Sequence, residues 1–113
     1  MTEDYDSSIE TVTDLADGDS ITVEVETDST EVSNVVLFVD DDAGNAPATY
    51  DVTAEVYRTD PDPAAWFYYA DEAGTTARSL TDPAYSQKMK YTITNRSGGP
   101  ADFRAILVAF EGE

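Results

Sequence analysis

The stretches Lys88-Met-Lys-Tyr-Thr-Ile-Thr-Asn95 and Ala101-Asp-Phe-Arg-Ala-Ile-Leu-Val-Ala-Phe110 decide the fold class. The first alternates apolar and polar residues, so a strand built from it has one apolar and one polar face. The second is apolar on both faces except at Arg104, which is typical of a strand that is central or covered on its outer side. Arg96-Ser-Gly-Gly-Pro100 between them is a turn signal, and the sequence therefore predicts a β-hairpin.

Working outward from this pair, the same period of two predicts further strands. They are expected over residues 8–14, 20–27, 32–39, 50–58, 66–69 and 75–80. Asp71-Glu-Ala-Gly74 is expected to turn the chain. Short strands at spacings of roughly 8–14 residues, with no helical pattern, predict an all-β fold.

The expected architecture is a single antiparallel β-sandwich of seven to eight strands, of the jelly-roll or Ig-like type. We expect residues 1–7 to form a flexible N-terminal arm and residues 8–113 to form the sandwich domain. The alternation also predicts which side chains point into the core: Val23, Val52, Val56, Ile93 and Leu107.

The chain contains no Cys and no His. Disulfides, thiolate nucleophiles, imidazole bases and the usual zinc and haem ligands are therefore excluded. Acid pairs such as Asp60 and Asp62 occur by chance in a domain this acidic, and a glycosidase needs a cleft and a set carboxylate separation. We predict a protein that is not an enzyme and that has no cofactor.

The charge is strongly acidic, with 24 Asp and Glu against six Lys and Arg and a net charge of -18. Such a surface suits a fold that stays hydrated in concentrated salt, where screening weakens self-repulsion. Without a basic footprint to neutralise phosphates, nucleic acid is excluded as a direct partner. No apolar run is long enough for a transmembrane helix and no secretory signal begins the chain, so we expect no membrane partner and no export by the usual route.

The segment Asp40-Asp-Asp-Ala-Gly-Asn45 resembles a calcium-binding loop. It departs from the EF-hand pattern, which alternates its ligands, places Gly sixth and ends on Glu. A structural cation at the edge of the sandwich, held by Asp40 and Asp42, remains one prediction, and a solvated acidic loop is the other. Separately, Asn95-Arg96-Ser97 matches the N-glycosylation sequon, but without an export signal an ordinary turn is the favoured interpretation.

The aromatic run Trp66-Phe-Tyr-Tyr69 places Trp66 and Tyr68 on one face of its strand and Phe67 and Tyr69 on the other. One pair serves the core. The second pair is then a protein-contact surface or a carbohydrate platform, because aromatic side chains are enriched at interfaces. A strand buried on both faces is the alternative.

All six basic residues lie after residue 57, and four of them lie in or beside the final predicted hairpin. If the two strands pair, Lys88 and Lys90 lie beside the outward apolar side chains of the last strand. The resulting partner-contact surface is predicted to contain Trp66, Phe67, Lys88, Lys90, Arg96 and Arg104. The alternative is that these bases pair with local acids, which contributes little to stability at a surface.

The pattern from Tyr50 onward is similar to a known class of proteins. It consists of Tyr50-Asp-Val-Thr-Ala-Glu-Val-Tyr57, Trp66-Phe, Ala77-Arg-Ser-Leu-Thr-Asp-Pro83 and Lys90-Tyr-Thr-Ile-Thr-Asn-Arg-Ser-Gly-Gly-Pro-Ala-Asp-Phe-Arg104. It resembles small β-sandwich virion proteins, of the decoration, turret or tail-associated kind, of viruses infecting halophilic archaea. The resemblance implies a non-enzymatic structural subunit, located in the virion after assembly in the host cytoplasm, whose partners are capsid or tail proteins and copies of itself.

Two other functions stay open. One is a cell-surface or secreted β-sandwich module of a halophile that binds carbohydrate or calcium. The other is an intracellular ligand-binding or regulatory sandwich, which a pocket lined by convergent polar groups would support.

Overall fold

The computed structural model describes residues 6–26, 32–58, 65–83 and 88–111. These residues form strands and no helix. The described part of the chain therefore contains no helix that could span a membrane. The strands are β1 (Asp6–Leu15), β2 (Ser20–Glu26), β3 (Val32–Asp40), β4 (Tyr50–Arg58), β5 (Ala65–Thr75), β6 (Ser79–Pro83), β7 (Lys88–Asn95) and β8 (Ala101–Glu111).

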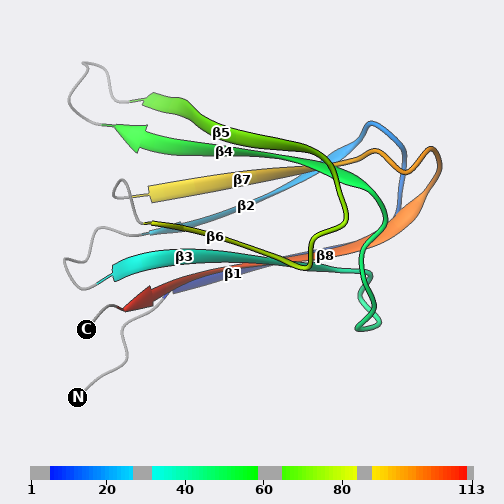
Figure 1. Cartoon of the computed structure of the whole chain (residues 1–113), viewed down its shortest axis with the longest axis horizontal. Coiled ribbons are helices and arrows are strands. Elements are labelled where there is room, and N and C mark those ends of the chain that lie inside the picture. Colours follow the sequence, from blue (N-terminus) through cyan, green and yellow to red (C-terminus); the bar gives the residue numbers. More distant parts are fainter. Residues whose placement is uncertain (1–5, 27–31, 59–64, 84–87, 112–113) are drawn as a thin grey trace.

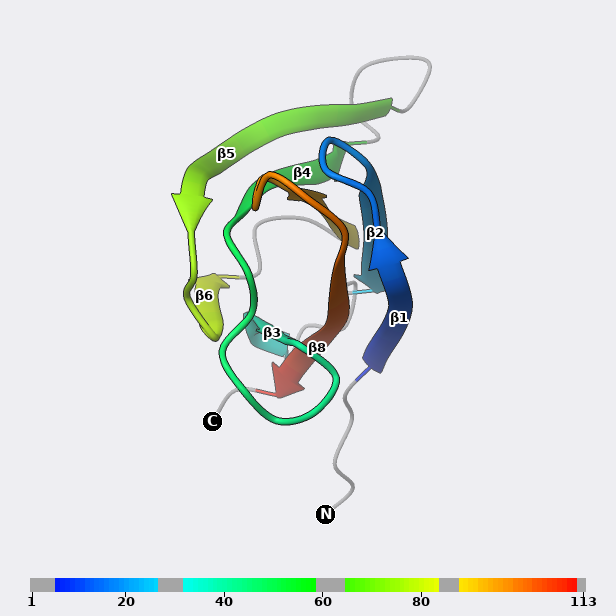
Figure 2. The ribbon, with the colours of Figure 1, turned by 90° about the vertical axis from the view of Figure 1, so that its right-hand side faces the viewer.

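Two antiparallel four-stranded sheets face each other, as Figures 1 and 2 show. The strand order is β1-β8-β3-β6 in the first sheet and β2-β7-β4-β5 in the second. This eight-stranded arrangement is a jelly roll, so the predicted antiparallel β-sandwich is confirmed and the jelly-roll alternative is the one adopted. The predicted arm lies partly outside the described residues, and β1 begins at Asp6, two residues earlier than expected.

The predicted hairpin at the end of the chain is wrong. β7 pairs with β2 and β4 in the second sheet, whereas β8 pairs with β1 and β3 in the first. The loop 96–100 therefore carries the chain from one sheet to the other (Figure 1). A strand with one buried face shows the same alternation in either arrangement, so the sequence pattern could not distinguish them.

The core lies between the inner faces of the two sheets. Val23, Val52, Ile93 and Leu107 are buried as predicted, and Val56 is partly buried against them. β8 is apolar on both faces because it is a central strand that lies between β1 and β3. The side chains on its inner face are fully buried. Of the two alternatives that the sequence left open, a central strand or a strand covered on its outer side, the structure shows the first.

β5 differs from the prediction in two ways. The chain does not turn at Asp71–Gly74; the strand continues to Thr75, and the strand expected over 75–80 is found at Ser79–Pro83. A β-bulge also interrupts β5, because Ala54 pairs with Ala70 while the next residue, Glu55, pairs with Tyr68. The extra residue shifts the alternation, so residues beyond the bulge face the opposite side from the one that strict alternation predicts.

Candidate functional site

Three aromatic side chains lie together on the outer face of the second sheet. In the register of β4 and β5, Tyr57 is opposite Trp66 and Glu55 is opposite Tyr68. Paired residues point to the same side of a sheet, and this side is the one opposite the buried Ala54. The Tyr57 and Trp66 ring centroids are 5.2 Å apart with planes at 63°, an edge-to-face contact.

Two lysines from β7 lie against these rings. The Lys88 ammonium nitrogen is 5.0 Å from the centre of the Tyr57 ring, and that of Lys90 is 4.5 Å from the centre of the Trp66 ring. Lys90 Nζ is also 3.6 Å from Glu55 Oε1. Each cation–π contact at such a site contributes about 0.5–1 kcal/mol. We call Tyr57, Trp66, Tyr68, Lys88 and Lys90 together the aromatic face.

Tyr68 is the most open member of the aromatic face, with 64% of its surface exposed. Its hydroxyl donates a hydrogen bond to Asp71, and this bond is the main reason why the pKa of Tyr68 lies above its ordinary value. The hydroxyl is thus engaged while the ring stays accessible. An exposed aromatic ring is suited to stacking on a flat ligand.

A band of hydroxyl groups continues the same outer face toward the other end of the strands. Ser20 Oγ and Thr94 Oγ1 are 2.7 Å apart, and Thr22 Oγ1 and Thr92 Oγ1 are 3.4 Å apart. Thr53 of β4 is opposite Thr92 and extends the band across the sheet. The surface therefore has an aromatic end and a hydroxyl-rich end, and both are built on strands rather than on loops.

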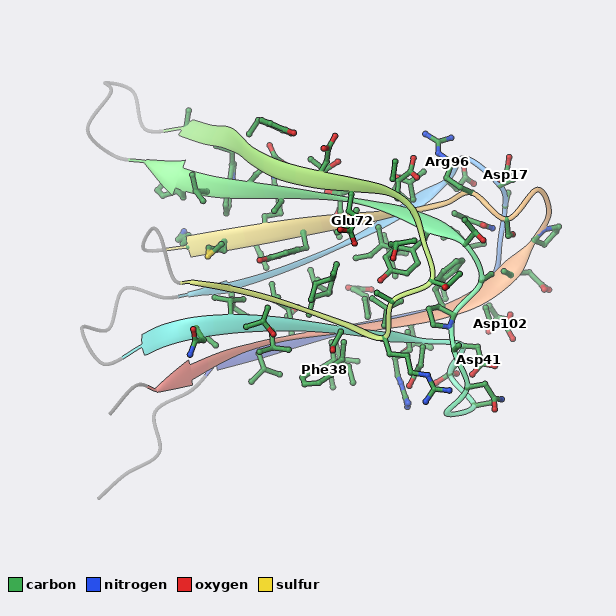
Figure 3. The ribbon with its side chains drawn as sticks, viewed as in Figure 1. Asp17, Phe38, Asp41, Glu72, Arg96 and Asp102 are labelled. Atoms are coloured by element: carbon green, nitrogen blue, oxygen red, sulfur yellow. The ribbon has the colours of Figure 1, made fainter. Side chains whose placement is uncertain are left out.

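The structure brings together three of the six predicted contact residues, namely Trp66, Lys88 and Lys90. The side chain of Phe67 lies outside the described residues. Arg96 is in the loop after β7 (Figure 3). Its Nε donates to Asp51 Oδ2 over 2.7 Å. Tyr57 was not among the predicted contact residues, although its alternation with Asp51, Thr53 and Glu55 marks it as an aromatic residue on a polar face.

The predicted neighbourhood of lysines and outward apolar residues does not exist. Lys88 and Lys90 lie on the outer face of the second sheet, whereas Ile106 and Val108 lie on the outer face of the first, on the other side of the molecule. The prediction assumed that β7 and β8 pair, and they do not. Arg104 belongs to the face that carries Ile106, so it is also remote from the lysines.

The predicted cation site at Asp40 and Asp42 receives no support. Arg104 donates hydrogen bonds from Nε and Nη2 to both carboxylate oxygens of Asp40, and its Nη1 is 3.6 Å from Asp42 Oδ1. These contacts, led by the Arg104 hydrogen bond, lower the pKa of Asp40. Asp41 instead accepts the backbone N–H groups of Ala43 and Asn45. Across residues 6–26, 32–58, 65–83 and 88–111, no group of three or more acidic side chains is arranged to hold a metal ion.

Asn95 has a structural role that explains the apparent sequon. The side chain is fully buried, and its Nδ2 donates to Leu15 O over 2.7 Å and to Gly99 O over 2.8 Å. Its Oδ1 accepts the N–H of Ser97. Asn95 Nδ2, to which a glycan would be attached, is thus buried and donates both of its N–H groups to backbone carbonyls. This supports the interpretation of Asn95-Arg96-Ser97 as a turn.

The sequence matches no protein-family model and no curated protein. Several solved structures have a similar fold. A chitosan-binding module of a chitosanase/glucanase from Paenibacillus sp. IK-5 has a TM-score of 0.57 at 15% identity, covering 88% of this chain and 74% of that one. The mitogen from Yersinia pseudotuberculosis has a TM-score of 0.58 at 10% identity, covering 99% and 89%.

A third similar structure is the family 32 carbohydrate-binding module of C. perfringens NanJ in complex with galactose. Its TM-score is 0.56 at 13% identity, with 93% of each chain covered. At these identities the comparisons establish a shared β-sandwich fold.

Proposed function

We propose that this protein is a non-catalytic binding module that binds carbohydrate on its aromatic face. The observation that carries the proposal is the side-by-side placement of Tyr57, Trp66 and Tyr68 on the outer face of a sheet, with lysine and glutamate side chains between them. The two carbohydrate-binding modules with a similar fold support it only as examples of what such a sandwich is able to do.

The chemistry of the aromatic face matches that of a sugar. Aromatic ring faces are electron-rich and attract the slightly positive C–H groups on the flat side of a sugar ring, as they attract cations. Lys90 Nζ is an N–H donor beside the Trp66 ring, and Glu55 beside it is an acceptor. Sugar hydroxyls need donors and acceptors of this kind at the edges of the stacking surface.

The test uses the single tryptophan of the chain as its reporter. Soluble oligosaccharides, including chitosan, cellulose and galactan fragments, are titrated in 1 M NaCl, and Trp66 fluorescence is followed. We expect at least one of them to change the Trp66 emission. Tyr68→Ala should weaken that binding about tenfold, equivalent to about 1.4 kcal/mol, because the most open stacking surface is lost.

Trp66→Ala is measured by calorimetry, since it removes the fluorophore, and should weaken binding at least as much. Phe38→Ala is the matched control: Phe38 is an exposed aromatic residue, 40% accessible, on the outer face of the opposite sheet (Figure 3). If no oligosaccharide changes the emission, or if Phe38→Ala weakens binding as much as Tyr68→Ala does, the proposal is wrong.

One observation favours a second candidate function, the virion subunit suggested by the sequence resemblance. On the outer face of the first sheet, Ile9, Ile106 and Phe38 stand opposite one another in a single row across β1, β8 and β3. Ile9 is 60% exposed, and contiguous exposed apolar surface is typical of subunit contacts. In this role the row is covered by a second copy of the chain.

Analytical ultracentrifugation in 1 M NaCl tests this second candidate. The salt shortens the Debye length to about 3 Å, so the repulsion between two copies of charge -18 no longer masks apolar association. We expect concentration-dependent dimers that Phe38→Asp abolishes while Tyr68→Asp leaves them intact. A protein that stays monomeric at high concentration and high salt would exclude this role.

A further inference from the structure

A cavity opens at one edge of the sandwich, where the edge strand of each sheet lies. β5 ends the second sheet and β6 ends the first, and Figure 2 shows both on the same side of the molecule. The cavity between them has a volume of about 220 Å³. Its floor is formed by Val52, Ala54, Leu80 and Tyr91, and its lining is completed by Asp71, Glu72 and Thr81. The floor is therefore mostly apolar and the lining includes two carboxylates, of which Asp71 is opposite Thr53 on the outer face of the sheet.

The β-bulge in β5 is the reason why Glu72 faces this cavity. Trp66 and Tyr68 point outward, and strict alternation would send Glu72 outward with them. Because the bulge adds one residue, Glu72 is opposite Val52, whose side chain is buried in the core. Figure 3 shows Glu72 on the side of β5 that faces β6.

Two further observations place the negative charge of Glu72 at the cavity. The pKa of the buried Tyr50 is raised to about 12 by its desolvation and, in second place, by the charge of Glu72, so this carboxylate, although exposed to solvent, lies near enough to act on Tyr50. Within the described residues, no Lys or Arg forms an ion pair with Glu72, whereas Asp40, Asp51 and Glu55 each have such a partner. Glu72 is an acidic side chain whose charge remains available to a ligand.

We propose that this edge cavity binds a small ligand that combines an apolar body with an ammonium group. The apolar body lies on Val52, Ala54 and Leu80, and the ammonium group pairs with Glu72. The size is suitable, since an apolar cavity of about 150 Å³ holds a benzene molecule, and the additional volume here accommodates a short aminoalkyl arm. Asp71 borders both this cavity and the aromatic face, but the residues that the tests change differ, Glu72 and Ala54 here and Tyr68 and Trp66 there, so either proposal can fail without the other.

Inward-pointing charges on edge strands also protect a sheet from pairing with other chains, and this function has to be separated from ligand binding. Glu10 of β1 provides the comparison. It is opposite the buried Ala105, so the register places it on the inner face of the edge strand at the other side of the first sheet, where β1 packs beside β2 and Glu10, like Glu72, stays exposed to solvent. If Glu72 only protects the sheet edge, Glu72→Gln and Glu10→Gln should have the same effect on ligand binding. If Glu72 binds the ligand, only Glu72→Gln should change it.

The experiment compares two probes of equal shape, benzylammonium and benzyl alcohol, by NMR titration of the whole chain in 1 M NaCl, where screening suppresses attraction to the acidic surface. We expect both probes to shift the amide signals of Ala54 and Leu80, with benzylammonium binding about tenfold more tightly. Glu72→Gln should remove that preference and leave benzyl alcohol binding unchanged within about twofold. Glu10→Gln should retain the preference.

A second variant tests the apolar floor. Ala54→Leu, confirmed as folded by circular dichroism, should weaken both probes because the added side chain fills the cavity. The proposal is overturned if neither probe shifts Ala54 and Leu80 in the native chain, if the two probes bind equally, or if Glu10→Gln removes the preference as completely as Glu72→Gln does. The comparison of native chain and Glu72→Gln decides the matter even if Ala54→Leu does not fold.

Discussion

Asn95→Ala should lower the free energy of unfolding by about 3–5 kcal/mol. The substitution removes the two N–H donors that satisfy Leu15 O and Gly99 O and the oxygen that accepts the Ser97 N–H. The buried Leu15 O left without a partner costs about 1–3 kcal/mol, and each of the two part-buried bonds that are lost contributes about 0.5–1.5 kcal/mol. Because these bonds join the turn after β1 to the loop that crosses between the sheets, one side chain holds both connections in place.

Urea denaturation of Asn95→Ala, followed by circular dichroism, measures this change. Asn45→Ala is the matched control, since Asn45 is exposed and its Nδ2 donates to Asp41 Oδ2 over 3.1 Å in a surface loop. We expect the control to change stability by less than about 1 kcal/mol. Equal effects of the two substitutions would show that Asn95 does not hold the loops.

Leu107→Ala should destabilise the fold by about 2–5 kcal/mol. Leu107 is fully buried at the middle of β8, opposite Ser8 of β1 on one side and Leu37 of β3 on the other. The truncation leaves a cavity that strands held on both sides cannot close. A loss of this size is a large share of the 5–15 kcal/mol typical of a whole domain.

The neighbouring residue on the same strand is the control for Leu107. Val108 points to the outer face and is only partly buried, so Val108→Ala should cost clearly less, about 1 kcal/mol. Thermal and urea denaturation of both variants measure the difference. If Val108→Ala were as damaging as Leu107→Ala, the assignment of inner and outer faces in β8 would be wrong.

The sequence predicted the strands well because strand signals are local. Period-two alternation marked β2, β4 and β7 nearly to the residue, and it identified Val23, Val52 and Ile93 as core residues. The choice of partner strand is not local, and this is why the final pair was predicted as a hairpin. Both arrangements bury one face of each strand, so the pattern of apolar residues is identical in the two.

Strand pairing also limited what the sequence could predict about the candidate sites. The sequence placed Trp66, Lys88 and Lys90 on one contact surface, and the structure does bring them together, but through the pairing of β7 with β4 rather than with β8. The inward position of Glu72 follows from the β-bulge in β5, which no residue type in the sequence predicts. The pairing of Arg104 with Asp40 depends on β8 lying beside β3, which spans a large separation in the chain.

The pairing of β1 with β8 has a consequence for how the chain folds. The first described strand has its sheet partner in the last one, and among the eight strands of the described residues only β4 and β5 are consecutive strands in the same sheet. Neither β1 nor β3 can complete its pairing in the sheet until β8 has been synthesised. Folds dominated by such distant contacts form in milliseconds to seconds, long after their individual segments are available. During that interval the apolar strands of the unfolded chain are exposed to solvent. The 16 acidic residues before residue 58 keep this unfolded chain hydrated and repel other copies of it.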